Sequence, residues 1–182
     1  MESKMNKNRQ QDLTVNERFE FRSISPEEAE QAADIEAVCF PPNEACSRAF
    51  LLALVKEAGD CFLAAVDKET GKIAGCLYGL RTNERSFNDA FFTDVSAHNP
   101  EGSTIMLLGL EVLPEYRKLG LARELVFDYC RREQERGIKR LVLTCHTDKV
   151  KMYRKLGFED LGESASVWGG EKWHEMCISL NW

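Results

Sequence analysis

The sequence predicts an α/β protein in which a single mixed β-sheet is flanked by helices. A continuous apolar run at Thr104–Val112, broken only by Gly109 and Glu111, is typical of a central strand that is buried on both faces. A glycine-containing turn and an amphipathic helix follow this run. Strand and helix patterns together give the order β-α-α-β-β-β-α-β-α-β, which favours one sheet with helices around it over a helical bundle or two domains.

The N-terminal part of the domain predicts one strand and two helices. Residues 19–22 alternate at period two, as in a half-buried strand. Ser25 precedes a proline and two glutamates, which is a strong helix start, and the helix should reach Phe40. Pro41-Pro42 should end it, because proline cannot donate a backbone hydrogen bond. Ser47 is a suitable N-cap for a second helix with one apolar face.

Two strands and a long connection are expected next. Residues 61–67 and 73–81 are apolar and β-branched enough to form strands, and the turn at 68–72 would join them as a hairpin. The polar segment 82–102 predicts a long mobile loop, anchored by its neighbouring phenylalanines.

The C-terminal half predicts two further helices and two further strands. A helix should begin near Ala122, with one apolar side, and end at Gly137. Residues 140–144 read as a buried strand, residues 149–156 as a short helix, and residues 173–180 as a last strand.

Length and hydropathy predict one domain. The 182 residues suffice for a sizeable core, and we assign residues 1–18 to a flexible tail and residues 19–182 to a single domain. No apolar run is long enough to span a bilayer, so no membrane partner is expected.

Charge and cysteine content exclude several other classes of protein. The net charge of −6 argues against a nucleic-acid-binding surface and is compatible with a cationic substrate. Seven cysteines, an odd number and without a Cys-x-x-Cys pair, predict reduced thiols in a cytoplasmic protein. The three histidines are not spaced with cysteines as metal ligands, so no metal is expected.

The turn after the central strand is a candidate anion site. A helix start offers unpaired N–H groups and the positive end of the helix dipole. Gly120 allows close approach of a ligand to the backbone, Ala122 is small, and Arg117 and Lys118 add positive charge. A chance glycine with two surface cations remains the alternative. The segment is neither a Walker loop nor a dinucleotide fingerprint, because it lacks the Gly-Lys-Ser/Thr and the three glycines those motifs need.

Two segments together resemble the signatures of the GNAT N-acetyltransferase family. The first is Leu-Glu-Val-Leu-Pro-Glu-Tyr-Arg-Lys-Leu-Gly-Leu-Ala at residues 110–122. The second is Met-Tyr-Arg-Lys-Leu-Gly-Phe at 152–158, separated from the first by one helix and one strand. The resemblance implies the GNAT-like fold: a mixed, mostly antiparallel sheet of about seven strands flanked by helices.

The resemblance also implies acetyl-CoA as cofactor. Backbone groups of the central strand would pair with the pantetheine arm between two splayed strands, and the turn would hold the pyrophosphate. The implied cofactor-binding residues are Leu110, Glu111, Val112, Arg117, Lys118, Leu119, Gly120, Leu121, Ala122 and Arg123.

Tyr153 is the candidate acid that protonates the leaving thiolate, since a phenol with a pKa near ~10 can protonate a thiolate whose pKa is near ~8.5. The sequence leaves open which group takes the proton from the amine. The serotonin enzymes of the family use two strand histidines, and Met106 and Leu108 stand at those positions here. His146, Glu111, or water relaying to Glu44 or Glu175 could replace them. A structural role for His146 and a core role for Tyr153 stay open.

Within the family, the chain most resembles arylalkylamine N-acetyltransferases and fungal polyamine-acetylating enzymes. Residues 39–45, 141–146 and 172–176 carry this resemblance. It implies acetyl transfer to a small primary amine by direct attack, with Cys145 as a packing residue. Acetylation of protein lysines or N-termini and a catalytically weak acyl-CoA sensor are the alternatives, and the oligomeric state is not predicted. The implied amine-site residues are Phe40, Pro41, Pro42, Glu44, Met106 and Leu108.

Overall fold

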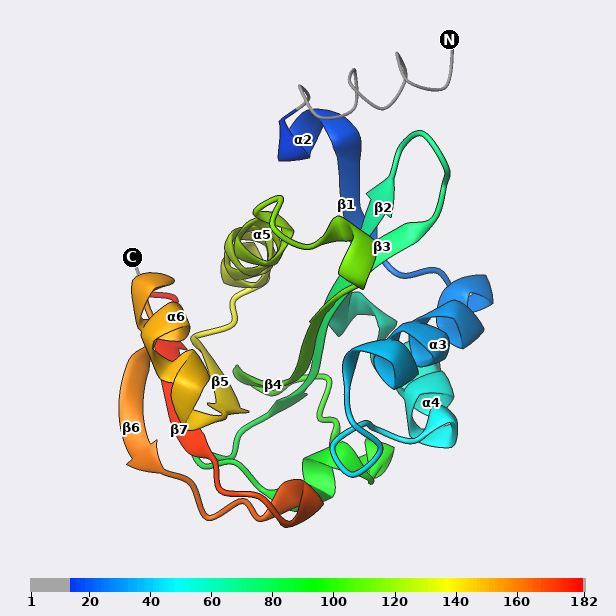
Figure 1. Cartoon of the computed structure of the whole chain (residues 1–182). Helices are drawn as coiled ribbons and strands as arrows, with labels where there is room; N and C mark the ends of the chain where they lie inside the picture. The colour runs from blue at the N-terminus through cyan, green and yellow to red at the C-terminus, as the bar shows by residue number, and fades with distance from the viewer. Residues whose placement is uncertain (1–13, 182) are drawn as a thin grey trace, which may run out of the picture.

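A single seven-stranded sheet forms the centre of the protein (Figure 1). The structure is a computed structural model and describes residues 14–181. The strands are β1 (Phe19–Ser23), β2 (Phe62–Asp67), β3 (Ile73–Thr82), β4 (Thr104–Val112), β5 (Arg140–Cys145), β6 (Glu159–Glu163) and β7 (His174–Ser179). Their order is β1-β2-β3-β4-β5-β7-β6, and β4–β5 is the parallel pair in an otherwise antiparallel sheet. The predicted fold class is confirmed.

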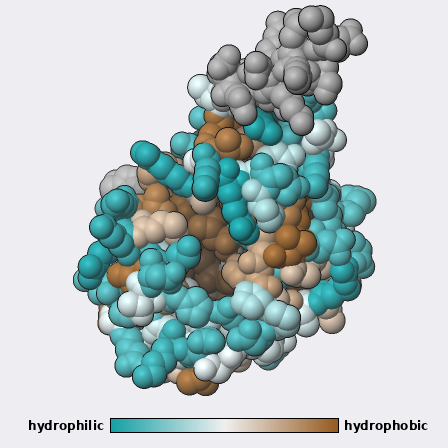
Figure 2. Space-filling view, in the orientation of Figure 1, coloured by the Kyte–Doolittle hydropathy of each residue, from teal (hydrophilic) through white to brown (hydrophobic). Residues whose placement is uncertain are grey.

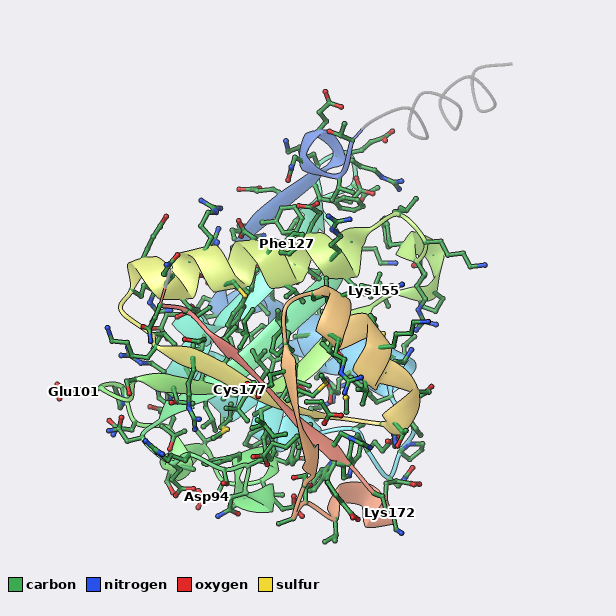
Figure 3. The ribbon with its side chains drawn as sticks, turned by 90° about the vertical axis from the view of Figure 1, so that its left-hand side faces the viewer. Asp94, Glu101, Phe127, Lys155, Lys172 and Cys177 are labelled. Atoms are coloured by element: carbon green, nitrogen blue, oxygen red, sulfur yellow. The ribbon has the colours of Figure 1, made fainter. Side chains whose placement is uncertain are left out.

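Helices lie on both faces of the sheet. They are α2 (Val15–Arg18), α3 (Ala29–Cys39), α4 (Arg48–Ala58), α5 (Leu121–Glu135) and α6 (Val150–Lys155). The pair α3 and α4 covers one face, and α5 packs on β2, β3 and β4 from the other (Figure 1). Figure 3 shows α5 crossing the sheet, with Phe127 on its outer side. None of the helices within residues 14–181 is long and apolar enough to cross a membrane.

The helix starts follow the predicted capping residues. Ser25 and Glu28 form a capping box around a short 3-10 turn, Pro26–Glu28, that leads into α3. The Ser47 hydroxyl accepts a hydrogen bond from the backbone N–H of Phe50 at 3.1 Å, which fixes the first turn of α4. The connection between α3 and α4, which carries Pro41-Pro42, lies near the ends of the central strands β4 and β5, where Cys39 contacts Val112 and Glu44 contacts His146.

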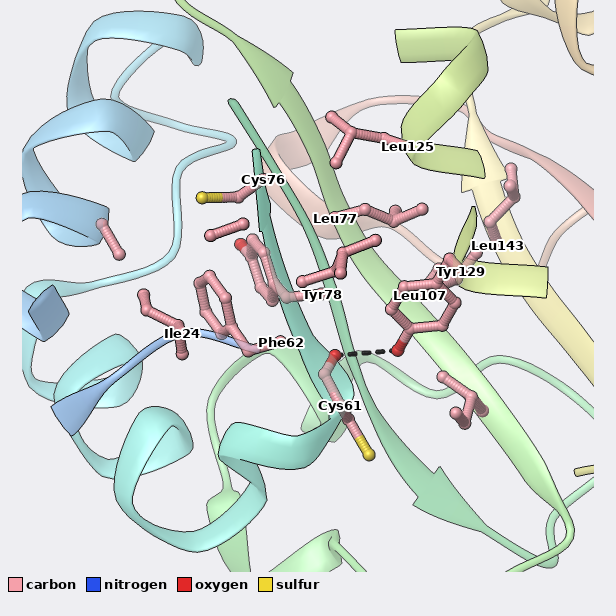
Figure 4. Close-up of a cluster of buried hydrophobic side chains, with 14 of the residues drawn as sticks. Ile24, Cys61, Phe62, Cys76, Leu77, Tyr78, Leu107, Leu125, Tyr129 and Leu143 are labelled. Carbon is pink, nitrogen blue, oxygen red and sulfur yellow. Dashed lines mark hydrogen bonds between the residues drawn. The ribbon is translucent and has the colours of Figure 1, made fainter. Parts of the chain in front are cut away.

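The sheet separates two parts of the hydrophobic core (Figure 4). On the side of α3 and α4, the rings of Phe62 and Tyr78 stack with centroids 4.6 Å apart. On the side of α5, Leu125 and Tyr129 pack over the strands, and the Tyr129 hydroxyl donates to the carbonyl of Cys61 at 2.8 Å. A central sheet that is buried on both faces explains why β3 and β4 are almost wholly apolar.

The element-by-element prediction found six strands and missed β6. This strand has the sequence Glu-Asp-Leu-Gly-Glu, and its side chains are exposed or only partly buried. It pairs with β7 at the edge of the sheet. A polar edge strand with a glycine carries no hydrophobic alternation, so the sequence pattern gave no signal for it.

The segment 82–102 differs from the expected mobile loop. Phe87, Phe91 and Phe92 are buried, and two short 3-10 turns, Asp89–Phe92 and Val95–Ala97, give it local structure. The carboxylate of Asp89 also accepts hydrogen bonds from the hydroxyl of Ser166 and from the Val167 amide. The segment is therefore fastened to the connection between β6 and β7.

The predicted tail lies mainly outside the described residues. Within its last part, Val15–Arg18 forms the one-turn helix α2, started by a capping box between Thr14 and Glu17. This short helix leads directly into β1.

Candidate active site

A cavity opens where β4 and β5 separate. The parallel pairing of these strands starts at Thr104 and ends at the pair Met106 and Val142, although β4 continues to Val112 and β5 to Cys145. The cavity between the separated ends has a volume of about 570 Å³. The face in Figure 2 is hollowed near its centre, where hydrophobic residues gather. The second half of β4 therefore offers unpaired backbone groups to a ligand, as an extra strand would require.

A β-bulge in β4 shapes the floor of this cavity. Tyr78 pairs with Gly109 and Gly79 pairs with Leu107, which leaves Leu108 as the extra residue. A Cβ atom on Gly109 would lie 2.5 Å from the ring of Tyr78, so only glycine fits beside that ring. The bulge shifts the alternation of side chains along β4. The side chain of Glu111 therefore lies toward α3 and not toward the gap between β4 and β5.

The start of α5 has the geometry of an anion site. Gly120 is the N-cap with φ +83°, and nothing lies within 4 Å of where its Cβ would be. The N–H groups of the first turn face this open space, and α5 is 15 residues long. Arg117 donates from Nε to the carbonyl of Val112 at 3.0 Å, which ties its side chain to the end of β4. These features fit a phosphate group.

Lys118 precedes this helix start in a strained conformation. Its φ is +64°, the one positive value at a non-glycine position within the described chain. A lysine pays a steric cost in this region that glycine avoids. Lys118→Gly should therefore raise the free energy of unfolding by about 1 kcal/mol, measured by denaturant titration. The same change at Lys149, where φ is −96°, should lower stability. A loss of stability in Lys118→Gly would contradict the strain argument.

Tyr153 of α6 reaches the cavity from the side of β5. Its ring packs edge-on against Phe158, with centroids 5.6 Å apart, and is partly buried against the core. Burial raises the pKa of the Tyr153 hydroxyl above its ordinary value, with a smaller contribution from the nearby Cys145. The phenol is thus protonated at neutral pH and can act as a proton donor.

His146 follows β5 and contacts a carboxylate across the cavity. Its Nε2 lies within hydrogen-bond distance of Glu44 Oε1, and its ring stacks on Trp173 with centroids 4.2 Å apart. The indole N–H of Trp168 donates to the backbone carbonyl of Glu44 at 2.8 Å, which holds the carboxylate in place. A histidine oriented by a carboxylate in this way can accept a proton.

Burial favours the protonated form of the two cysteines that line this site, Cys39 and Cys145. All seven cysteines are free, and Cys145 lines the cavity near Tyr153. Burial raises the pKa of the Cys145 thiol to about 11, and its sulfur packs against Met176 at 3.5 Å. The thiol is therefore a packing group, as the sequence predicts. Among residues 14–181, no group of three or more potential ligands is arranged to hold a metal ion.

Comparison with a model of the acetyltransferase (GNAT) family gives a match over residues 26–158. The match covers most of the chain, including β4, the start of α5 and Tyr153. The chain belongs to the GNAT acetyltransferase family. A search of curated proteins finds no match to the sequence.

Solved structures show the same GNAT fold. The GNAT-like decarboxylase GphF in complex with isobutyryl-CoA is 19% identical, with a TM-score of 0.73 over 89% of this chain and 100% of that one. A phosphinothricin acetyltransferase from Sinorhizobium meliloti, in complex with acetyl-CoA, is 15% identical, with a TM-score of 0.62 over 88% of each chain. The ribosomal-protein-S18-alanine N-acetyltransferase from Escherichia coli is 17% identical, with a TM-score of 0.63 over 90% of this chain and 95% of that one.

Most of the residues predicted for the GNAT site meet at one cavity. Those that line it are Tyr153, His146, Phe40, Pro41, Glu44, Leu108, Leu110, Glu111, Val112, Arg117 and Ala122. Those outside its lining are Pro42, Met106, Lys118, Leu119, Gly120, Leu121 and Arg123.

The residues that do not line the cavity lie in other parts of the fold. Met106 is fully buried and paired on both sides within the sheet, so its side chain does not line the cavity. Pro42 is exposed and does not line the cavity, in contrast to its neighbour Pro41. Leu121 is buried in the core, and the guanidinium of Arg123 lies 5.1 Å from the ring centroid of Phe127. Lys118 and its neighbours form the turn that leads into α5.

Phe92 and Glu36 are among the residues that line the GNAT cavity but were not assigned to the site by the sequence analysis. Phe92 comes from the segment 82–102 and stacks on Trp168 with centroids 4.6 Å apart, so its place depends on a long-range contact. Glu36 is a carboxylate on the buried stripe of α3, with Ala32, Ile35 and Cys39. A charged residue on such a stripe is a signal that the sequence does contain.

Proposed function

We propose that the protein is an acetyl-CoA-dependent N-acetyltransferase that acts on a small primary amine, an arylalkylamine or a polyamine, by direct attack. The observation that carries this proposal is the common cavity. The unpaired part of β4, Tyr153 and the His146–Glu44 pair all line it.

The residues present fit acetyl-CoA. The backbone groups of Leu110 and the N–H of Val112, which lie beyond the last β4–β5 pair, can pair with the amides of a pantetheine arm. The start of α5, with Gly120 and the nearby Arg117, can hold the pyrophosphate. Two of the similar solved structures hold an acyl-CoA, isobutyryl-CoA in one and acetyl-CoA in the other. When bound, the acetyl thioester supplies the activated acyl group.

The side chains of the cavity divide the proton transfers between them. An amine must lose a proton before it attacks a carbonyl carbon, and His146, oriented by Glu44, accepts that proton. Tyr153 lies on the same cavity and donates a proton to the departing thiolate sulfur. The C–N bond forms as the C–S bond breaks, and no covalent bond to the protein is needed.

The walls of the cavity favour a small acceptor over a protein. Phe92 and Trp168 stack on each other at one side, and the contact of Asp89 with Ser166 joins the two loops that carry them. This contact keeps the Phe92–Trp168 pair in place as one wall of the cavity, which supports a small acceptor. Aromatic rings beside the Glu44 carboxylate suit a cationic amine.

A panel of acceptors tests the proposed function. Purified protein and acetyl-CoA are incubated with tryptamine, phenethylamine, spermine or a lysine peptide, and free thiol is measured. Release with one or more of the three small amines and none with the peptide is expected. Release with the peptide alone would replace the small-amine proposal with protein acetylation. Acetyl-CoA binding by calorimetry without release from any acceptor would leave only an acyl-CoA sensor.

The His146–Glu44 pair should matter most near neutral pH. His146→Ala is expected to lower kcat/KM for the amine about tenfold at pH 7, because water can carry part of the proton transfer. The loss should shrink as the pH rises toward the pKa of an alkyl amine, near ~10.4, because more amine then arrives unprotonated.

His98→Ala is the matched control for this change. His98 is part-buried and accepts a hydrogen bond from the Arg81 amide at 3.0 Å, but it does not line the cavity. It should leave kcat/KM within about twofold at each pH. A loss in His146→Ala that is constant with pH would exclude a role in amine deprotonation.

A further inference from the structure

Two glutamates meet beneath the cavity in the protein core. Glu36 of α3 is 2% exposed and Glu111 of β4 is 3% exposed. Within residues 14–181, no donor gives a hydrogen bond to either carboxyl oxygen of Glu111. Its polar neighbour is the carboxyl of Glu36, and a hydrogen bond between two carboxyls requires a proton on one of them. We call Glu36 and Glu111 the carboxyl pair.

Glu36 connects three parts of the fold. Its Oε1 accepts a hydrogen bond from the Tyr78 hydroxyl of β3 at 2.7 Å. Its Oε2 accepts one from the backbone N–H of Cys46 at 2.9 Å. Cys46 ends the connection between α3 and α4, so this bond fixes the end of residues 40–46. We call residues 40–46 the amine-site segment, because Phe40, Pro41 and Glu44 line the cavity.

The two carboxyls cannot both be ionised at this depth. Burial raises the pKa of Glu111 well above its ordinary value, and the charge of Glu36 and a hydrogen bond with Glu36 raise it further. Glu111 is therefore the protonated partner, and Glu36 is the acceptor. The other titratable groups that face Glu111 are Cys39 of α3, Cys46 of the amine-site segment, and Cys76 and Tyr78 of β3.

Both parts that the carboxyl pair joins, the amine-site segment and β4, line the cavity. Glu111 belongs to the open half of β4, while Glu36 holds the amine-site segment through Cys46. A second contact supports the same junction, since the thiol of Cys39 lies 3.5 Å from the carbonyl of Val112 and donates to it. The oxygens of Glu111 are themselves enclosed, so they cannot contact a substrate directly.

We propose that the single proton shared by Glu36 and Glu111 holds the amine-site segment against β4, so that the pair positions the amine wall relative to the cofactor strand. A role of the amine wall in catalysis rests on the proposed function. The attachment of residues 40–46 to β4 does not. Glu36 and Glu111 are thus positioning residues. Loss of the shared proton places two negative charges side by side in the core and releases the segment.

Two substitutions at Glu111 distinguish the effect of the shared proton from the effect of the space that the side chain fills. Glu111→Gln keeps a donor for Glu36, whereas Glu111→Leu fills similar space without one. In Glu111→Leu, the backbone amides of residues 44–46 should exchange hydrogen about tenfold faster than in wild type at pH 7, measured by mass spectrometry. The KM for the amine should rise about tenfold, with kcat and the affinity for acetyl-CoA within about twofold. Glu111→Gln should restore both.

The pH dependence gives an independent test. Because the pKa of Glu111 is raised on folding, the folded state keeps a proton that the unfolded chain loses above pH ~4.5. Wild type should therefore lose up to about tenfold in its folding equilibrium constant per pH unit relative to Glu111→Gln, until Glu111 ionises. Above that pH, wild-type residues 44–46 should exchange faster than those of Glu111→Gln at the same pH.

Glu133→Gln is the matched control. Glu133 is also buried, and burial raises its pKa to about 7, but it lies on α5 beside Arg136 and outside the cavity. It should change neither the exchange of residues 44–46 nor the amine KM. The proposal would be overturned if the amides of residues 44–46 exchanged at the wild-type rate in Glu111→Leu. It would also be overturned if Glu111→Gln did not restore the wild-type rate. The exchange measurement needs no acceptor, so an inactive protein would refute the proposed function while leaving this attachment testable.

Discussion

Replacing Tyr153 with phenylalanine should lower kcat about thousandfold while the affinity for acetyl-CoA stays within about twofold. The ring would keep its contact with Phe158, and only the hydroxyl at the cavity would be lost. A thiolate would then have to leave without a proton. Burial raises the pKa of Tyr153, so its hydroxyl should stay protonated above pH ~10. Ionisation of Tyr153 should therefore not lower the activity of the wild-type enzyme at that pH. Steady-state kinetics and calorimetry check these results.

Tyr129→Phe is the control for this substitution. Tyr129 is buried in α5, and its hydroxyl donates to the carbonyl of Cys61 on the other side of the α5 core from the cavity. Its loss should cost about 1–2 kcal/mol of unfolding free energy, because a buried carbonyl loses its donor, with kcat unchanged. Wild-type kcat in Tyr153→Phe would remove Tyr153 as the acid and leave the leaving group to solvent.

The central part of the fold could be predicted because its sequence pattern and its environment agree. The run Thr104–Val112 forms β4 with the predicted bounds, since a strand buried on both faces is apolar throughout. Ser47 caps α4, and Ser25 caps the short 3-10 turn that leads into α3. The polar edge strand β6 could not be found in this way, because neither of its faces is covered enough to select apolar residues.

The site was partly predictable for a different reason. Residues that act through local backbone geometry, such as Gly120 at the start of α5, leave a local pattern in the sequence. Contacts across the fold leave none. The approach of His146 to Glu44 joins residues 102 positions apart, and the position of Glu111 depends on a bulge at Leu108 that shifts the strand register. A parity argument along an ideal strand cannot anticipate such a bulge.

The bulge, the carboxyl pair and the cavity form one structural unit. Gly109 lies against the ring of Tyr78, and the hydroxyl of that tyrosine donates to Glu36. The amine-site segment is bonded to the same Glu36 through Cys46. The amine-site segment is therefore attached to the sheet through the buried side chain of Glu36.

Placing a carboxylate at Gly120 should weaken acetyl-CoA binding about hundredfold. The open space beside Gly120 is where the pyrophosphate is proposed to lie, so Gly120→Asp puts a negative charge within a few ångströms of two phosphates. At a partly exposed site, repulsion of about 3 kcal/mol follows, which corresponds to about hundredfold in Kd. Calorimetric titration with acetyl-CoA measures the change, and it should diminish at high salt.

The control for Gly120→Asp is Gly71→Asp, which separates charge from backbone strain. Gly71 has φ +72° in the turn between β2 and β3, and nothing lies within 4 Å of where its Cβ would be. Both substitutions place aspartate in the same left-handed conformation, so each should lower the unfolding free energy by about 1 kcal/mol. Only Gly120→Asp should change the Kd for acetyl-CoA. Equal Kd values in the two variants would show that the start of α5 does not hold the pyrophosphate, and the phosphate site would then have to be sought elsewhere along the cavity.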